Sequence, residues 1–174
     1  MAHSIYNFKF DTSNCESSEQ EYELKHQMTR LYWANITSFF LQKGKSIKFM
    51  YWSDDIKDEY SGYPNSGYGI KKISTSDEHI FHEKVTEDIM IIHAPINGTV
   101  KNLLLNSMNE EHITISPFFH FDILCEQGIS VFTSQDFGEN VLMFLSNEDV
   151  TRLNELIDTS MLIRLPEDMT NNFS

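Results

Sequence analysis

Two polar side chains in the second half of the chain, His120 and Asp122, have the types and spacing of an acid–base pair. Residues two apart on a β-strand point to the same face, and a carboxylate beside an imidazole is half of many acid–base sites. The nucleophile would be a serine or Cys125, but strand alternation places Cys125 on the opposite, apolar face, as a small buried hydrophobe. No Gly-x-Ser-x-Gly elbow is present. We therefore interpret the pair as an exposed cross-strand pair, and keep a small cytoplasmic hydrolase using His120 and Asp122 as the alternative function.

A second group of histidines has the spacing of metal ligands. His79 and His82, followed by Glu83, would share one face of a helix, but a zinc site needs a third and usually a fourth ligand. His93, His120 and Asp122 are available in principle, although no sequence spacing ties them to the first pair. Surface histidines in a charged segment explain the pattern better, so we expect no bound metal and no cofactor.

Two short sequences resemble parts of nucleotide-binding motifs, but the other residues that these motifs require are missing. Gly44-Lys45-Ser46 could end a phosphate-binding loop, but the glycine required five residues earlier is Phe39. Asp136-Phe137-Gly138 spells the kinase metal-binding triplet without the other kinase motifs. We interpret its glycine as part of a turn between strands.

The segment 53–69 is the most informative part of the sequence for function. It combines acids and tyrosines with turn-forming Gly and Pro residues: Asp54, Asp55, Asp58, Glu59, Tyr60, Tyr63 and Tyr68. Loops of this length without secondary structure are usually functional or disordered. Tyrosines are enriched in interface hot spots, and carboxylates steer a cationic partner. The segment is therefore either a protein-binding loop or a mobile, solvated one.

The first half of the chain predicts two strands and a long helix that must position these residues. Strands are expected at 4–10 and 46–52. Between them, Ser18 and Glu21 have the spacing of a capping box, and the helix should run to about Lys43, before Gly44 at the left-handed cap. Its predicted buried stripe comprises Leu24, Met28, Leu31, Tyr32, Asn35 and Phe39. Because Tyr22, Trp33 and Phe40 lie off that stripe, we expect cover on more than one side or an aromatic patch.

The remaining elements predict a mainly antiparallel sheet. Strands are expected at 70–75, 88–93, 129–133 and 141–145, the last covered on both faces because it is apolar throughout. A strand from 112 should place six residues on its apolar face, with Pro117 at an edge or bulge: Ile113, Ile115, Phe119, Phe121, Ile123 and Cys125. Helices are expected at 97–108 and from Ser146 or Asn147. The fold class is α+β: one domain at 1–166, a sheet packed by the long N-terminal and the shorter C-terminal helix, and a flexible tail at 167–174.

The charge is high and unevenly distributed. The formal net charge is −13, which argues against nucleic acid and anionic lipid as partners. Residues 1–87 hold ten Lys and Arg and 13 acids, whereas residues 88–174 hold three and 13, and such asymmetry sometimes marks an interaction surface. No apolar run could span a membrane. With no export signal and only two cysteines, we expect a cytoplasmic protein with reduced thiols.

The stretch from Asp54-Asp55 to Tyr63-Pro64 resembles, in composition, bacterial immunity proteins that neutralise cationic toxins, often nucleases. The resemblance covers under a tenth of the chain. It implies a non-catalytic protein that covers a cationic toxin domain by stoichiometric occlusion, without nucleic acid or membrane contact. The partner-binding residues would be those seven of the 53–69 segment, with Asp136 and Glu139 as further candidates. A structural or regulatory subunit binding a basic protein is a third possibility.

Overall fold

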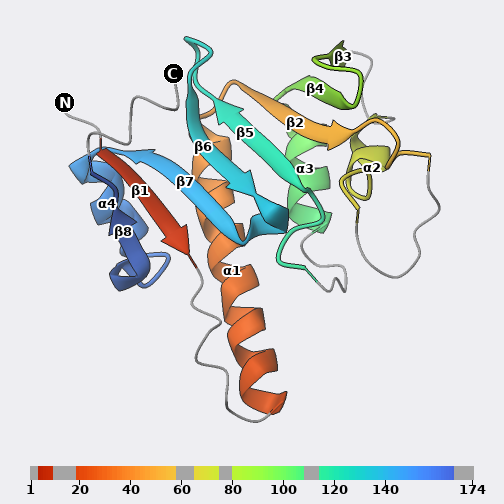
Figure 1. Ribbon diagram of the computed structural model, residues 1–174. Helices are drawn as coiled ribbons and strands as arrows, with labels where there is room; N and C mark the ends of the chain where they lie inside the picture. Colours follow the sequence, from red (N-terminus) through yellow and green to blue (C-terminus); the bar gives the residue numbers. More distant parts are fainter. Residues whose placement is uncertain (1–3, 10–18, 58–64, 75–79, 108–113, 167–174) are drawn as a thin grey trace.

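A computed structural model describes residues 4–9, 19–57, 65–74, 80–107 and 114–166. Eight strands form one sheet in the order β3-β4-β2-β5-β6-β7-β1-β8, and every adjacent pair is antiparallel (Figure 1). The strands are β1 (Ser4–Lys9), β2 (Ser46–Trp52), β3 (Phe81–Lys84), β4 (Ile89–Pro95), β5 (His120–Leu124), β6 (Ser130–Gln135), β7 (Asn140–Leu145) and β8 (Leu162–Arg164). The helices are α1 (Glu19–Lys43), α2 (Ile70–Ser74), α3 (Gly98–Ser107) and α4 (Asn147–Leu153). The predicted α+β fold is confirmed.

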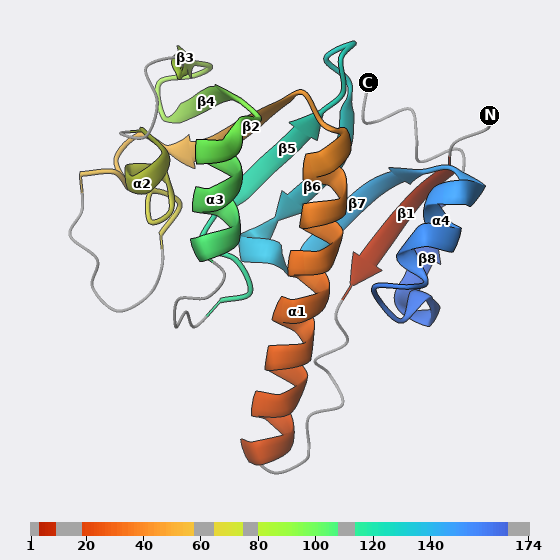
Figure 2. The same ribbon diagram turned by 180° about the vertical axis from the view of Figure 1, so that it is seen from behind.

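In the part of the chain that the structure describes, helices cover one face of the sheet. All four helices contribute to a single apolar core, for example through Trp33 of α1, Ile73 of α2, Val100 of α3 and Leu153 of α4. The strands supply alternate residues to the same core, such as Ile47, Phe49 and Tyr51 of β2. Seen from behind, α1 and α3 lie across the sheet (Figure 2). No helix of the described chain covers the opposite face, which we call the open face.

Helix α1 packs with a different face from the one predicted. Trp33, Ile36 and Phe40 are buried, and the Trp33 indole donates a 3.0 Å hydrogen bond to Ser134 Oγ on β6. Within the predicted stripe, Phe39 is buried, but Leu24 and two neighbours, Met28 and Leu31, are exposed. The prediction was wrong because α1 is apolar on two sides, and the aromatic side fits the sheet. Ser18 of the proposed capping box lies outside the described residues.

The predicted strand from 112 begins only at His120. In the segment before it, Ile115 and Phe118 are both buried, so the expected alternation fails. Pro117 cannot donate to a ladder, and the segment instead docks on the turn after β6, where Ser116 N–H donates to Phe137 O at 2.8 Å. Of the face assignments, Phe121 and Ile123 in the core are confirmed. Residue 113 is not described.

Several other elements differ from expectation. Residues 70–74 form α2 rather than a strand, because Ile70 and Ile73 bury one side of a helical turn. Strands β3 and β8 were not predicted, since both are short edge strands with mostly exposed side chains. Strand β7 is buried on one face rather than two, with Leu142 and Phe144 only partly covered. Strand β2 and helix α3 agree with the prediction.

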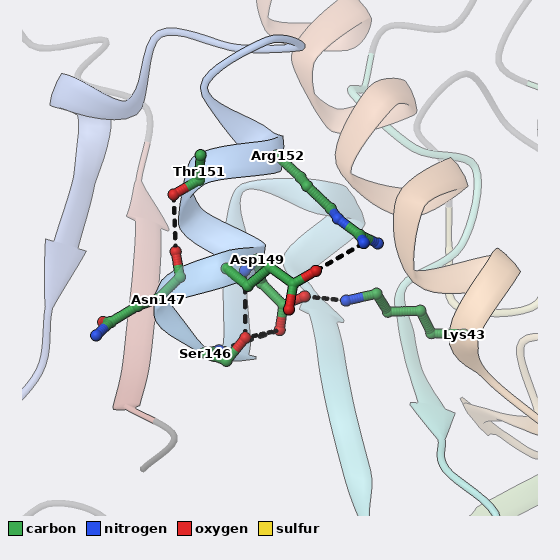
Figure 3. Close-up of polar contacts among 7 residues, drawn as sticks. Lys43, Ser146, Asn147, Asp149, Thr151 and Arg152 are labelled. Carbon is green, nitrogen blue, oxygen red and sulfur yellow. Dashed lines mark hydrogen bonds and ion pairs between the residues drawn. The ribbon is translucent and has the colours of Figure 1, made fainter. Parts of the chain in front are cut away.

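Helix α4 begins as predicted and is joined to α1 at its first turn. Ser146 caps the helix in a complete capping box with Asp149, which satisfies two backbone donors reciprocally. Lys43, at the end of α1, pairs with the same Asp149 carboxylate (Figure 3). Burial of that carboxylate raises its pKa, but hydrogen bonds from Lys43 and Ser146 outweigh burial, so the pKa lies below its usual value. The junction fixes α4 beside α1.

Candidate functional site

The predicted His120–Asp122 pair lies on the open face within a larger polar network. His120 Nε2 lies 3.3 Å from Asp122 Oδ2. The other carboxylate oxygen accepts hydrogen bonds from Ser130 Oγ, at 3.1 Å, and from Thr133 Oγ1. The Asp122 side chain is 25 % exposed. Strands β5 and β6 therefore hold three polar side chains, His120, Ser130 and Thr133, around the half-buried Asp122 carboxylate.

A bulge in β6 brings Ser130 to this network. Ile123 pairs with Phe132 but Leu124 pairs with Ser130, so Val131 is an extra residue. A bulge of this kind re-aims the next side chain. Val131 and Phe132 both pack against the core, and Ser130 instead reaches Asp122 on the open face. Strict alternation along the strand would instead place the Ser130 side chain on the face covered by the helices.

The network holds Asp122 ionised. Burial of the carboxylate raises its pKa, but hydrogen bonds from His120, Thr133 and Ser130 and the charge of His120 more than compensate, so the pKa lies below its ordinary value. A general base works best when its pKa lies near the working pH, so a carboxylate with a depressed pKa is a poor general base at neutral pH. Asp122 is better suited to accept hydrogen bonds as a permanent negative charge. Because an ionised carboxylate can only accept hydrogen bonds, Nε2 of His120 carries the hydrogen of its bond to Asp122.

The arrangement of the network does not activate a nucleophile. In serine-based catalysis, the imidazole bridges the hydroxyl and the carboxylate. Here the carboxylate of Asp122 lies between Ser130 and His120, so the serine hydroxyl contacts the acid and not the base. The network therefore does not present Ser130 as a nucleophile activated by His120.

Polar side chains on the strands beside β5 extend the network into a row that crosses the sheet. Lys48 of β2 is directly opposite Asp122 on one side and His93 on the other, and His93 Nε2 lies 2.6 Å from Glu83 Oε2 of β3. Across the described ranges, no group of three His, Cys, Asp or Glu side chains is placed to hold a metal ion. His79 lies outside them, and His82 lies on strand β3 rather than on a helix.

Further along β2, one turn of side-chain alternation beyond Met50, the strand ends in an exposed tryptophan that the sequence pattern had not drawn attention to. Trp52 is 44 % exposed and is paired with Ile89 of β4. Ser53 N–H donates to Asp88 O at 2.8 Å, which joins the β2 end to the β3–β4 turn. The side chains of Asp54, Glu87 and Asp88 are exposed here. The alternation in 46–52 was the available signal, because it places Trp52 on the same face as Lys48.

The predicted residues Asp136 and Glu139 lie at the same end of the sheet. Met50 pairs with His120, Phe121 with Ser134 and Gln135 with Asn140, so the β6–β7 turn and the β2 end point the same way. Both acids are exposed. We call Trp52 and five carboxylates the acidic end: Asp54, Glu87, Asp88, Asp136 and Glu139. Lysines are also present, since segment 53–88 carries nine acids and four lysines.

The other residues predicted from the 53–69 segment divide into two groups. Asp55 is used internally, because its carboxylate accepts hydrogen bonds from the amide and hydroxyl of Ser66, whose Oγ accepts one from Trp52 N–H. Asp54 is exposed and pairs with Lys57 at 2.9 Å, and Tyr68 is half-buried. Four predicted contacts lie outside the described residues: Asp58, Glu59, Tyr60 and Tyr63. The role of Asp55 as a partner-binding residue stays a prediction.

No helix within the described ranges is both long and apolar enough to cross a membrane. No family model, no curated protein and no solved structure matches the chain.

Proposed function

We propose that the chain is a non-catalytic binding protein that neutralises a cationic protein by stoichiometric occlusion, with the acidic end as its contact surface. The observation that carries the proposal is the exposed Trp52 side chain at the rim of the open face, in a region where Asp54, Glu87 and Asp88 are also exposed. Tryptophan is among the residues most enriched in binding hot spots. Its ring also attracts Lys and Arg side chains.

The charges of the acidic end suit rapid association with such a partner. The carboxylates extend over three separate turns, 53–57, 85–88 and 136–139, which the strand pairing brings to one end of the sheet. Exposed carboxylates accelerate encounter with a basic protein and suppress anionic partners. The net charge of −13 extends this bias to the molecule as a whole. The partner class is therefore a basic protein domain.

The compositional resemblance to bacterial immunity proteins suggests which basic domain this is. A toxin that acts on nucleic acid needs a cationic cleft, and an acidic protein that covers the cleft stops it without chemistry. The proposed site of action is the cytoplasm of the producing cell. A gene for such a toxin directly beside the gene for this chain would support this assignment.

The test is affinity capture from the native host, followed by binding kinetics with the captured protein. Trp52→Ala should raise the dissociation rate and weaken binding by about 30-fold, because a truncated hot spot costs about 2 kcal/mol. The triple variant Asp54→Asn, Glu87→Gln, Asp88→Asn should instead slow association, with an effect that shrinks at high salt. The two variants therefore leave different kinetic traces.

Matched controls come from the β5–β6 turn at the other end of the sheet. Ile129→Ala removes an exposed apolar side chain, and Glu126→Gln removes an exposed acid. Both should bind as the wild type does. Equal binding by all variants would move the contact surface elsewhere. Loss of function in a folded His120→Ala variant, with binding intact, would favour the hydrolase.

A further inference from the structure

Helix α1 carries an exposed apolar stripe on the side that faces away from the sheet. Leu24, Met28 and Leu31 are 60 %, 45 % and 58 % exposed. Their spacings of four and three residues place them on one side of the helix, opposite Trp33 and Phe40, which pack into the core. In both views the N-terminal half of α1 extends beyond the edge of the sheet (Figures 1 and 2).

The stripe continues onto the turn that follows α4. Asn35 Nδ2 donates a 3.1 Å hydrogen bond to the carbonyl of Leu156, and Asn35 lies one helical turn beyond Leu31. The Leu156 side chain is 42 % exposed. We call Leu24, Met28, Leu31 and Leu156 the α1 ridge. Its two parts are held in register by the Asn35 bond and by the Lys43–Asp149 pair described above.

Acidic side chains border the ridge at both ends. Glu21 and Glu23 are exposed near the N-terminus of α1, and Glu155 and Asp158 flank Leu156 in the chain. Within the described residues, none of these four carboxylates forms an ion pair. An apolar centre with a charged rim is the usual anatomy of an interface. Here the four carboxylates outnumber the exposed Lys25 beside Leu24, so the rim favours net positive charge on the partner.

We propose that the α1 ridge docks a cationic amphipathic helix of another protein. An apolar helix face would lie along Leu24, Met28 and Leu31, as amphipathic helices do when they bind through anchors one turn apart. Lys or Arg at the edges of that helix would face the four carboxylates. A second copy of this chain fits less well, because it would bring like charges together. Anionic lipid is repelled for the same reason. The inference uses residues distinct from the acidic end and is independent of the function proposed for it.

The probe is a synthetic peptide of about 18 residues, five helical turns, built from Leu and Lys with one apolar face. Its binding to the full chain is measured by fluorescence anisotropy, together with a scrambled peptide of equal charge. The wild type should bind the amphipathic peptide at least about tenfold more tightly than the scrambled one, a difference of about 1.4 kcal/mol. Leu31→Gln should abolish that preference, since a polar group would then face the apolar helix.

Two control variants show whether the effect belongs to the ridge. Ile129→Gln changes an equally exposed apolar residue on a distant turn, and Trp52→Ala changes the acidic end; both should keep the preference. Equal binding of both peptides, or unchanged binding by Leu31→Gln, would overturn the proposal. A wild-type dimer that Leu31→Gln converts to monomer in sedimentation would also overturn it, because the ridge would then be occupied by a second copy.

Discussion

Substitution of Asp122 by Asn should destabilise the protein at neutral pH although it removes no apolar contact. The carboxylate accepts hydrogen bonds from Ser130 and Thr133 through one oxygen and faces His120 through the other. Asparagine keeps the shape and one acceptor, but its NH2 group presents donors where the network already supplies donors. The change therefore removes the charge and at least one hydrogen bond from a half-buried site.

The size of the effect follows from these contacts. A hydrogen bond to a charged group contributes about 1.5–3 kcal/mol, and partial exposure of Asp122 reduces that value, so we expect a loss of about 2 kcal/mol. For a chain of this length, each kcal/mol lowers Tm by about 2–4 °C. The Asp122→Asn variant should therefore melt about 4–8 °C below the wild type at pH 7.

The pH dependence has a definite sign. The folded-state pKa of Asp122 is depressed, so its stabilising contribution is complete above the unfolded value of about 3.9 and is lost as pH falls through the folded value. The difference between wild type and Asp122→Asn should be largest near neutrality and should shrink in acid, where both side chains are uncharged. Urea unfolding from about pH 7 down to the lowest pH at which the wild type folds measures this difference.

The matched control for this experiment is Asp54→Asn. Asp54 is exposed and pairs with Lys57, which is also exposed, and such surface pairs contribute little. Its unfolding free energy should stay within about 0.5 kcal/mol of the wild type at every pH. The reasoning fails if Asp122→Asn is as stable as this control at neutral pH, or if its deficit persists unchanged in acid.

Three further substitutions test the packing described above. Trp33→Phe should cost about 1–3 kcal/mol in denaturant unfolding, because it leaves the buried Ser134 hydroxyl without its indole donor. Gly138→Ala should cost a similar amount in thermal melts, since Gly138 has φ +93° and a Cβ there would lie 3.0 Å from Trp33 Nε1. Asp149→Ala should cost about 1 kcal/mol at neutral pH by removing half of the Ser146 capping box; because the folded pKa of Asp149 is depressed, urea titrations should show this difference vanishing in acid.

Elements with an unambiguous local pattern could be predicted from the sequence. Strand β2 alternates strictly, and α4 begins at a capping box that Ser146 and Asp149 complete. Helix α1 could be located but not oriented, because apolar residues occur on two of its sides and the sheet packs against the one that contains Trp33. Strands β3 and β8 could not be predicted, because the side chains of an exposed edge strand show almost no alternation of apolar and polar residues.

The candidate sites could be predicted only in part, because they bring together residues far apart in the sequence, and residue spacing does not show which strands are neighbours. Strand alternation placed His120 and Asp122 together, but only the β6 bulge brings Ser130 to them. Asp54 and Asp136 were predicted as partner-binding residues for separate reasons, and their position at one end of the sheet follows from strand order. Asp55 was predicted to contact a partner, and its hydrogen bond from the Ser66 amide was not predicted, because a local side-chain-to-backbone bond of this kind depends on the loop geometry.

The central claim, that the acidic end binds a cationic protein, is tested most directly by hydrogen exchange on the complex with the captured partner. We predict slower amide exchange in residues 52–57 and 85–89, where Trp52 and the neighbouring acids lie, and in the turn at 136–139. The amides of the β5–β6 turn at 126–129 should be unaffected. Protection confined to that turn or to α4, with no change around Trp52, would contradict the account.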